Sequence, residues 1–135
     1  MPFWSYHDHT IAGDENVRLV PSLRSRQGSM WSKKPFEKDW WEIEVHIRIS
    51  GRGKIGADGM ALWYTVEGAP TDNSDRRVYG ARDRWMGLGI ILDSFDNDNQ
   101  QDNPIILAMV NDGSKQYNHY QVWPNTNRRE YSMAN

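Results

Sequence analysis

Oxygen-bearing side chains are concentrated in one stretch of the sequence, DSFDNDNQQDNP, which runs from Asp93 to Pro104. Carboxylates packed this densely repel one another unless a cation lies among them, and Ca²⁺ accepts about six to eight such oxygens. The pattern therefore favours a calcium site over a solvated acidic turn. It is not typical of an EF-hand, because the glycine and glutamate of that loop and its flanking helices are missing. The oxygen-bearing side chains of this stretch include Asp93, Asp96, Asn97, Asp98, Asp102 and Asn103.

Asp58 lies in a second suggestive stretch, the loop and strand IGADGMALWYT. An aspartate among glycines often bonds its own backbone, and the residue alone leaves that alternative open. Beside a bound Ca²⁺, however, such a carboxylate is well suited to accept hydrogen bonds from sugar hydroxyls. His119 is one of four histidines, and taken alone it indicates a structural or surface residue as readily as a ligand.

The elements that would position these residues are short strands. WEIEVHIRIS alternates strictly between apolar and polar residues, which predicts an antiparallel strand with one wet face. Near-continuous apolar runs elsewhere predict strands deep in a sheet, and NDG predicts a hairpin turn. No window has helical periodicity, so the sequence indicates an all-β sandwich or barrel. The expected strands are 41–50, 59–66, 86–95, 104–110 and 116–120, with the turn at 111–113.

Composition excludes several classes of function. The 135 residues suffice for one domain at most, and a net charge of −2 disfavours a nucleic-acid partner. There is no cysteine, so neither a disulfide framework nor a thiolate metal site is possible. The sequence has no stretch long and apolar enough for a membrane span and no visible signal peptide.

Five segments together resemble the L-type (legume-like) lectins of the early secretory pathway, the ERGIC-53 family of mannose-binding cargo receptors. The family implies a concanavalin-like antiparallel β-sandwich, present here only in part, in which Ca²⁺ holds the sugar-binding loops in shape. It also implies location in the lumen of the endoplasmic reticulum or the ER–Golgi intermediate compartment. The segments are VRLVPSLRSRQGSMWSK, WEIEVHIRISGRG, IGADGMALWYT, WMGLGIILDSFDND and NDGSKQYNH.

The resemblance also assigns roles to individual residues. Asp58 matches the family's sugar-binding aspartate, and the Ala57–Asp58 peptide matches a position where these lectins have a cis bond. Asn97 and His119 match sugar-contacting residues. Asp93, the carbonyl of Phe95 and Asn97 match calcium ligands. A second calcium ion is implied at Asp96, Asp98, Asp102 and Asn103.

The chain departs from the family after His119. The aspartate that completes the family's calcium site is replaced by Tyr120, Gln121 and Val122, and no acid follows until Glu130. The second half of the lectin domain and its leading strand have no counterpart in the sequence. We therefore expect residues 1–120 to form a partial carbohydrate-recognition domain and residues 121–135 to form a divergent, disordered tail.

The resemblance implies Ca²⁺-dependent binding of high-mannose N-glycans on secretory glycoproteins. A glycosidase would need two carboxylates roughly 5–9.5 Å apart across a cleft, whereas the acids here are bunched in one loop, so no catalytic residue is expected. The alternative is a fragment that binds no sugar and acts only through a protein partner or self-association. That alternative follows from the missing aspartate, because calcium affinity depends on ligand charge.

Overall fold

The computed structural model describes residues 2–51, 53, 56–72, 78–97, 99 and 103–120. The chain divides into two compact units, Met1–Lys54 and Ile55–Asn135. Every regular element in the described ranges is a β-strand and all paired strands are antiparallel, so the prediction of an all-β protein is confirmed. Within those ranges no helix is long and apolar enough to cross a membrane.

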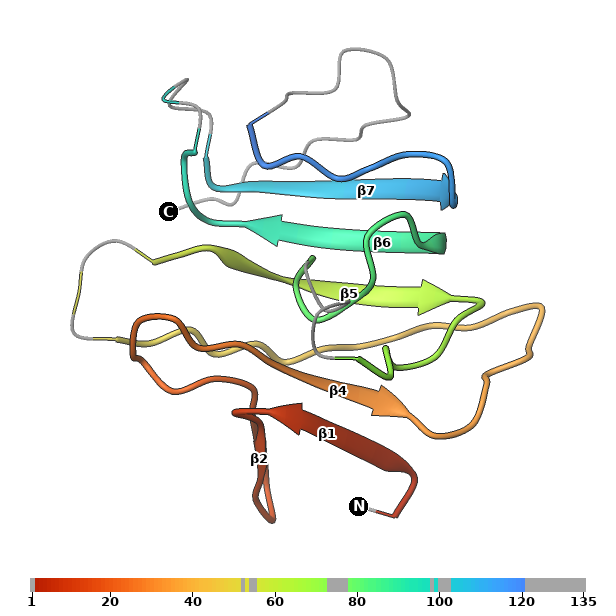
Figure 1. Cartoon of the computed structure of the whole chain (residues 1–135). Helices are drawn as coiled ribbons and strands as arrows, with labels where there is room; N and C mark the ends of the chain where they lie inside the picture. Colours follow the sequence, from red (N-terminus) through yellow and green to blue (C-terminus); the bar gives the residue numbers. More distant parts are fainter. Residues whose placement is uncertain are drawn as a thin grey trace. The chain divides into compact units, whose positions relative to one another are not determined.

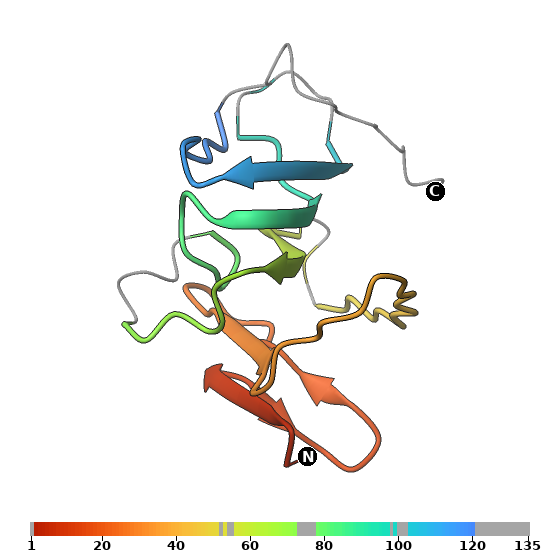
Figure 2. The same ribbon diagram turned by 90° about the vertical axis from the view of Figure 1, so that its right-hand side faces the viewer.

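The second unit is built on a three-stranded antiparallel sheet in the order β5-β6-β7 (Figure 1). Its strands are β5 (Gly59–Thr65), β6 (Met86–Asp93) and β7 (Ile105–Asp112). Figure 2 shows the same three strands side by side from a second direction. Each coincides with one of the predicted apolar runs, so those three strand predictions are confirmed. In an unbroken apolar run, side chains on both faces of the strand must be buried, and this favours a strand in the interior of the protein.

The core of this unit is aromatic. Trp85, immediately before β6, is 1% exposed, and its ring meets that of Trp63 edge to face, with 4.9 Å between centroids. Edge-to-face contacts of this kind stabilise more than their buried area alone would give. Trp85 is therefore a packing residue and has no access to a ligand. The other buried members of this cluster are Val78, Ile91, Met109 and Tyr117.

The β5–β6 register brings two predicted site segments together, because Gly59 pairs with Asp93. Gly59 has φ of 155°, and a Cβ on it would lie 2.2 Å from the carbonyl oxygen of Leu92. No side chain fits there without moving the backbone. The glycine thus permits the close approach of the strand that follows Asp58 to the strand that ends at Asp93.

Gly59→Ala should therefore destabilise the protein by about 2 kcal/mol, through strain and overpacking. Urea denaturation followed by tryptophan fluorescence measures the loss. Gly68→Ala is the matched control, since a Cβ at Gly68 has no heavy atom within 4 Å. Equal midpoints for the two variants would contradict this account of the close approach.

The first unit contains two small antiparallel pairs. β1 (Trp4–Asp8) pairs with β4 (Gly28–Ser32), and β2 (Ile11–Ala12) pairs with β3 (Val17–Arg18). They are short, and two-stranded ribbons gain little stability in isolation.

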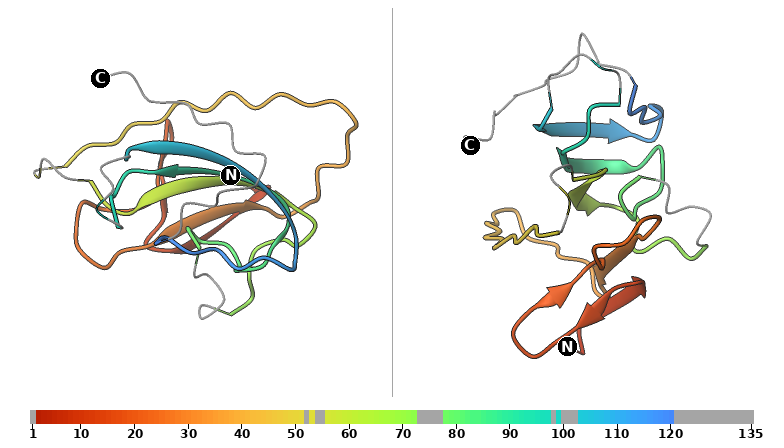
Figure 3. Two further views of the ribbon diagram at one scale, coloured as in Figure 1. Left: turned by 90° about the horizontal axis from the view of Figure 1, so that it is seen from above. Right: turned by 90° about the vertical axis from the view of Figure 1, so that its left-hand side faces the viewer.

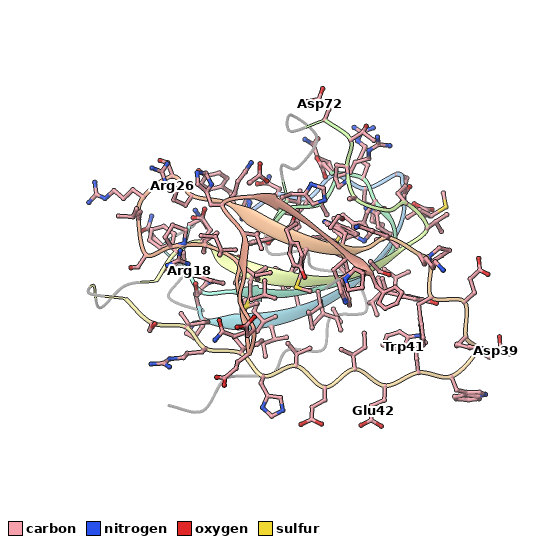
Figure 4. The ribbon with its side chains drawn as sticks, turned by 90° about the horizontal axis from the view of Figure 1, so that it is seen from below. Arg18, Arg26, Asp39, Trp41, Glu42 and Asp72 are labelled. Carbon is pink, nitrogen blue, oxygen red and sulfur yellow. The ribbon has the colours of Figure 1, made fainter. Side chains whose placement is uncertain are left out.

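Residues 41–50 do not form the paired strand that the sequence predicted. Within the described ranges no strand pairs with this segment, although its backbone is extended (Figure 3). Trp41 and Glu42 point to opposite sides of the segment, as the alternation requires (Figure 4). Its apolar side chains are exposed, from 37% at Trp41 to 71% at Ile49. Alternation separates the two faces of an extended chain, but it does not supply the neighbour whose hydrogen bonds make a strand.

The hairpin turn predicted at 111–113 is wrong as placed, because β7 continues through Asp112 and the chain bends only at Gly113. Gly113 has φ of 89°, and its N–H donates to the Trp85 carbonyl at 3.0 Å and to Asn111 Oδ1 at 3.1 Å. The strand predicted at 116–120 is wrong, because that segment is irregular. The Asn111 side chain also binds the backbone of Lys115, so the chain leaves the turn tied to β7 by a side chain and not by a strand ladder.

Candidate calcium and sugar site

Asp93 is the last residue of β6, and only 5% of it is exposed. Its Oδ1 accepts the backbone N–H of Phe95 at 3.2 Å, a local bond typical of aspartate at the end of an element. Its carbonyl accepts the side-chain N–H of Asn103 at 3.3 Å. The strand end therefore places a buried carboxylate at the start of the acidic loop and ties the loop's return to it.

Asn97 has the clearest unsatisfied hydrogen-bond acceptor in this loop. Its Oδ1 is buried and has no hydrogen-bond partner in the described part of the chain. A buried acceptor without a donor costs about 1–3 kcal/mol, so such an atom calls for a ligand or an ion. A hard cation would satisfy it, and amide and carboxylate oxygens are the donors that Ca²⁺ prefers. The residues present therefore fit the predicted ion.

The predicted ligand set is only partly placed. Phe95 and Asp96 lie half-buried beside Asn97, and Asn103 is bound to Asp93. Asp98 and Asp102 lie outside the described residues, so the predicted second calcium site stays a prediction. Within those same limits, no three His, Cys, Asp or Glu side chains gather as a metal-binding group.

Asp58 lies beside the end of β6. Its carbonyl accepts the backbone N–H of Ser94 at 3.0 Å and the Ser94 hydroxyl at 3.2 Å, while the residue itself is exposed. The Ala57–Asp58 peptide is cis, as the family resemblance implied. The Asp58 backbone is thus tied to the residue after Asp93. Its carboxylate is accessible to a ligand.

His119 lies half-buried against two tyrosines. Its ring meets Tyr117 edge to face at 4.8 Å between centroids and Tyr79 at 5.4 Å. The Tyr79 hydroxyl is 3.4 Å from His119 Nδ1. Sequence reasoning missed both tyrosines. The spacing Tyr117-x-His119 was an available signal, because alternate residues of an extended segment share a side.

The same tyrosines connect His119 to the predicted calcium ligand. Burial, followed by the charge of Asp93, raises the pKa of Tyr117 to about 12. Burial, followed by the charges of Tyr117, Asp93 and Asp58, raises the pKa of Tyr79 well above its usual value. Both hydroxyls therefore remain protonated at neutral pH. The charges of Asp93 and Asp58 thus act on Tyr79, and both tyrosine rings lie against His119.

Comparisons with known proteins agree with this reading of the residues. The model of the legume-like lectin family matches residues 1–128. Rat protein ERGIC-53 is 43% identical over 119 residues, which are 88% of this chain and 22% of that protein. Dog vesicular integral-membrane protein VIP36 is 41% identical over 124 residues, 88% of this chain and 33% of that protein.

The solved VIP36 exoplasmic/lumenal domain in its Ca²⁺/Man3GlcNAc-bound form is also similar in structure. It has a TM-score of 0.77 and 38% identity, covering 88% of this chain and 50% of that chain. The metal-free form of the same domain matches with a TM-score of 0.69. The predicted legume-lectin-like sandwich fold is thereby confirmed. The chain spans about half of this domain and a fifth to a third of the curated relatives.

Proposed function

Since this chain belongs to the legume-like lectin family, we propose that it binds mannose-rich N-glycans of secretory glycoproteins in a Ca²⁺-dependent manner. One observation carries the proposal. The exposed Asp58 is hydrogen-bonded to the residue that follows the buried Asp93, in a chain 38% identical to a lectin domain solved with Ca²⁺ and Man3GlcNAc. The cluster is thus arranged for a cation and a polyhydroxylated ligand side by side.

In this proposal each residue has a separate task. Asp93, the Phe95 carbonyl and Asn97 hold the ion, which fixes the loop and neutralises its charge. The Asp58 carboxylate accepts hydrogen bonds from sugar hydroxyls, the Asn97 amide donates to or accepts from them, and His119 contacts the sugar at the edge of the site. In this proposal no covalent bond is made or broken, and the protein acts as a binding module and not as an enzyme. Its place would be the lumen between endoplasmic reticulum and Golgi.

Retention on immobilised Man3GlcNAc tests the proposal. The chain should be retained in about 1 mM calcium, released by a chelator, and retained again when calcium is restored. A calcium concentration near 1 mM is sufficient to occupy sites of the extracellular type. Immobilised lactose is the matched control matrix. Retention that is equal on both matrices, or insensitive to the chelator, would contradict it.

Self-association through residues 41–50 is a second candidate function, favoured because no strand of the described ranges pairs with this extended segment and its apolar side chains are exposed. We infer that the partner is a second copy, because the polar face is self-complementary. In an antiparallel pair centred on Val45, Glu42 would face Arg48 of the other copy and Glu44 would face His46. On the other face Ile43 would meet Ile47. Cross-strand pairs of this kind stabilise antiparallel strands.

Charge reversal tests this pairing. Glu42→Arg and Arg48→Glu should each weaken dimerisation about tenfold, since each places like charges opposite one another twice in the dimer. An equimolar mixture of the two variants restores both opposite-charge pairs and should dimerise again in sedimentation equilibrium. The pairing would be refuted by a monomeric wild-type chain, or by a mixture that dimerises no more tightly than either variant alone. Either result would show that another segment covers this face.

A further inference from the structure

Asp58 is followed by a glycine, and this sequence makes its carboxyl group reactive toward the backbone. Glycine has no side chain to shield its nitrogen, so an Asp-Gly peptide can close into a five-membered succinimide ring. Asp-Gly occurs at two places in the chain, Asp58–Gly59 and Asp112–Gly113. Since the residue types are the same, a difference in reactivity between the two places comes from the fold.

The nitrogen of Gly59 lies at the exposed end of β5. The Ser94 N–H donates to the Asp58 carbonyl at 3.0 Å, so these two residues form a hydrogen-bonded pair of the antiparallel ladder. The next pair, Gly59 with Asp93, is then of the non-hydrogen-bonded kind. The N–H of Gly59 therefore points away from β6. Both Asp58 and Gly59 are exposed, so water reaches this peptide.

The Asp58–Gly59 peptide is also activated at its carbonyl oxygen. This oxygen accepts a second hydrogen bond, from the Ser94 hydroxyl at 3.2 Å. An amide nitrogen becomes nucleophilic when it loses its proton, and the negative charge then spreads onto the carbonyl oxygen. Two donors that point at an oxygen where charge develops stabilise that charge, as in an oxyanion hole. Ser94 supplies both donors to the reacting amide.

The second Asp-Gly peptide is held in the opposite way. The N–H of Gly113 donates to the Trp85 carbonyl at 3.0 Å and to Asn111 Oδ1 at 3.1 Å. An amide proton shared between two acceptors is protected from removal. The Asp112 carboxylate accepts the Ser114 N–H at 3.0 Å, which restrains its side chain. Asp112 is therefore a poor site for ring closure, although it is exposed.

We propose that Asp58–Gly59 is a site of spontaneous isoaspartate formation, promoted by the two donors of Ser94. The Gly59 nitrogen attacks Cγ of Asp58, and the N–Cγ bond forms. One carboxyl oxygen leaves as water, with the proton of the nitrogen and that of the carboxyl group. Water then opens the ring: addition at the former backbone carbonyl gives isoaspartate, and addition at Cγ restores aspartate. One water is released and one is taken up, so no other reactant is needed.

Isoaspartate alters the geometry at Asp58. The backbone then runs through Cβ and Cγ and is one carbon longer, and the carboxylate is attached directly to Cα. A bulkier neighbour cannot prevent the reaction, since a Cβ on Gly59 would lie 2.2 Å from the Leu92 carbonyl oxygen. We expect the product to bind no sugar. That consequence rests on the proposed function, whereas the modification itself does not.

Peptide mapping after incubation at physiological pH and temperature, without calcium, tests the modification. Asp-N endoproteinase cleaves before aspartate and not before isoaspartate, so an uncut Ala57–Asp58 bond reports the product. The rate at each Asp-Gly is divided by its rate in the guanidinium-unfolded chain, which removes intrinsic reactivity. We expect a ratio of at least about one at Asp58 and below about one tenth at Asp112. A ratio at Asp58 no higher than that at Asp112 would overturn the proposal.

Two variants test the role of Ser94. Ser94→Ala removes the hydroxyl donor and should slow isoaspartate formation at Asp58 roughly fivefold, as for one lost hydrogen bond. Ser94→Thr keeps the hydroxyl and should keep the wild-type rate. Circular dichroism shows whether both variants are folded. An unchanged or faster rate in folded Ser94→Ala would show that the donors do not promote the reaction.

Chromatography of an aged sample on immobilised Man3GlcNAc in calcium tests the consequence for binding. Chains with isoaspartate at position 58 should collect in the unretained fraction, and chains with aspartate should be retained. Equal isoaspartate content in the two fractions would contradict the expected loss of binding. A fresh chain that is not retained would refute the proposed function, and the peptide map would still decide the modification.

Discussion

Asp93→Asn should lower calcium affinity at least about 100-fold and abolish calcium-dependent glycan binding. Asp93 is a carboxylate, 5% exposed, at the point where β6 runs into the acidic loop. The amide keeps the size of the side chain, so packing is retained while one ligand charge is lost. The chain already lacks an acid between His119 and Glu130, and each remaining charge therefore matters more. Isothermal calorimetry with calcium measures the change.

Asp112→Asn is the control for this variant. Asp112 pairs with Met86 at the opposite end of the same sheet, whereas Asp93 pairs with Ile105. Its pKa is lowered by hydrogen bonds from Ser114, and it is fully exposed. The control should bind calcium like the wild type. Equal affinity in the two variants would mean that Asp93 is no ligand and that the loop binds its ion elsewhere, if at all.

Asp58→Asn should separate sugar recognition from ion binding. We expect glycan affinity to fall about 100-fold, because hydrogen bonds to a charged group are worth roughly twice those to a neutral one. Calcium affinity should stay within about twofold, since the contacts that join this loop to Ser94 use the Asp58 carbonyl and not its side chain. Calorimetry measures calcium affinity by titrating the ion into metal-free protein, and glycan affinity by a second titration of Man3GlcNAc at saturating calcium.

The same replacement at Asp39, an exposed residue of the first unit, is the control and should leave both affinities unchanged. Loss of calcium affinity together with glycan affinity in Asp58→Asn would show that Asp58 supports the ion. Unchanged glycan binding would remove Asp58 from the sugar site.

The sequence was most informative where local pattern and burial agree. β5, β6 and β7 are nearly unbroken apolar runs, and such runs have few stable places outside a sheet. The neighbourhood of Asp58 and Asp93 followed from their positions at the ends of two of these strands. The cis Ala57–Asp58 peptide was predictable only from the family resemblance, because the residue types alone do not indicate it.

Prediction failed where the outcome depends on a distant partner. The alternation in 41–50 was right about the two faces and wrong about pairing, because period two specifies no neighbour. The segment 116–120 looked like a strand, yet Asn111 and Asp83 hold it as an irregular chain through side-chain contacts. Tyr79 was not predicted at all. Its position depends on a turn with positive φ at a tyrosine, which residue preference argues against.

Calcium-dependent mannose recognition is tested most directly by calorimetry on the wild-type chain, first shown to be folded by circular dichroism. Calcium is titrated first, and Man3GlcNAc is then titrated with and without the ion. We predict saturable calcium uptake, followed by glycan binding that occurs only in the calcium-loaded sample. A folded chain that takes up no calcium, or that binds the glycan equally well without it, would contradict the central claim.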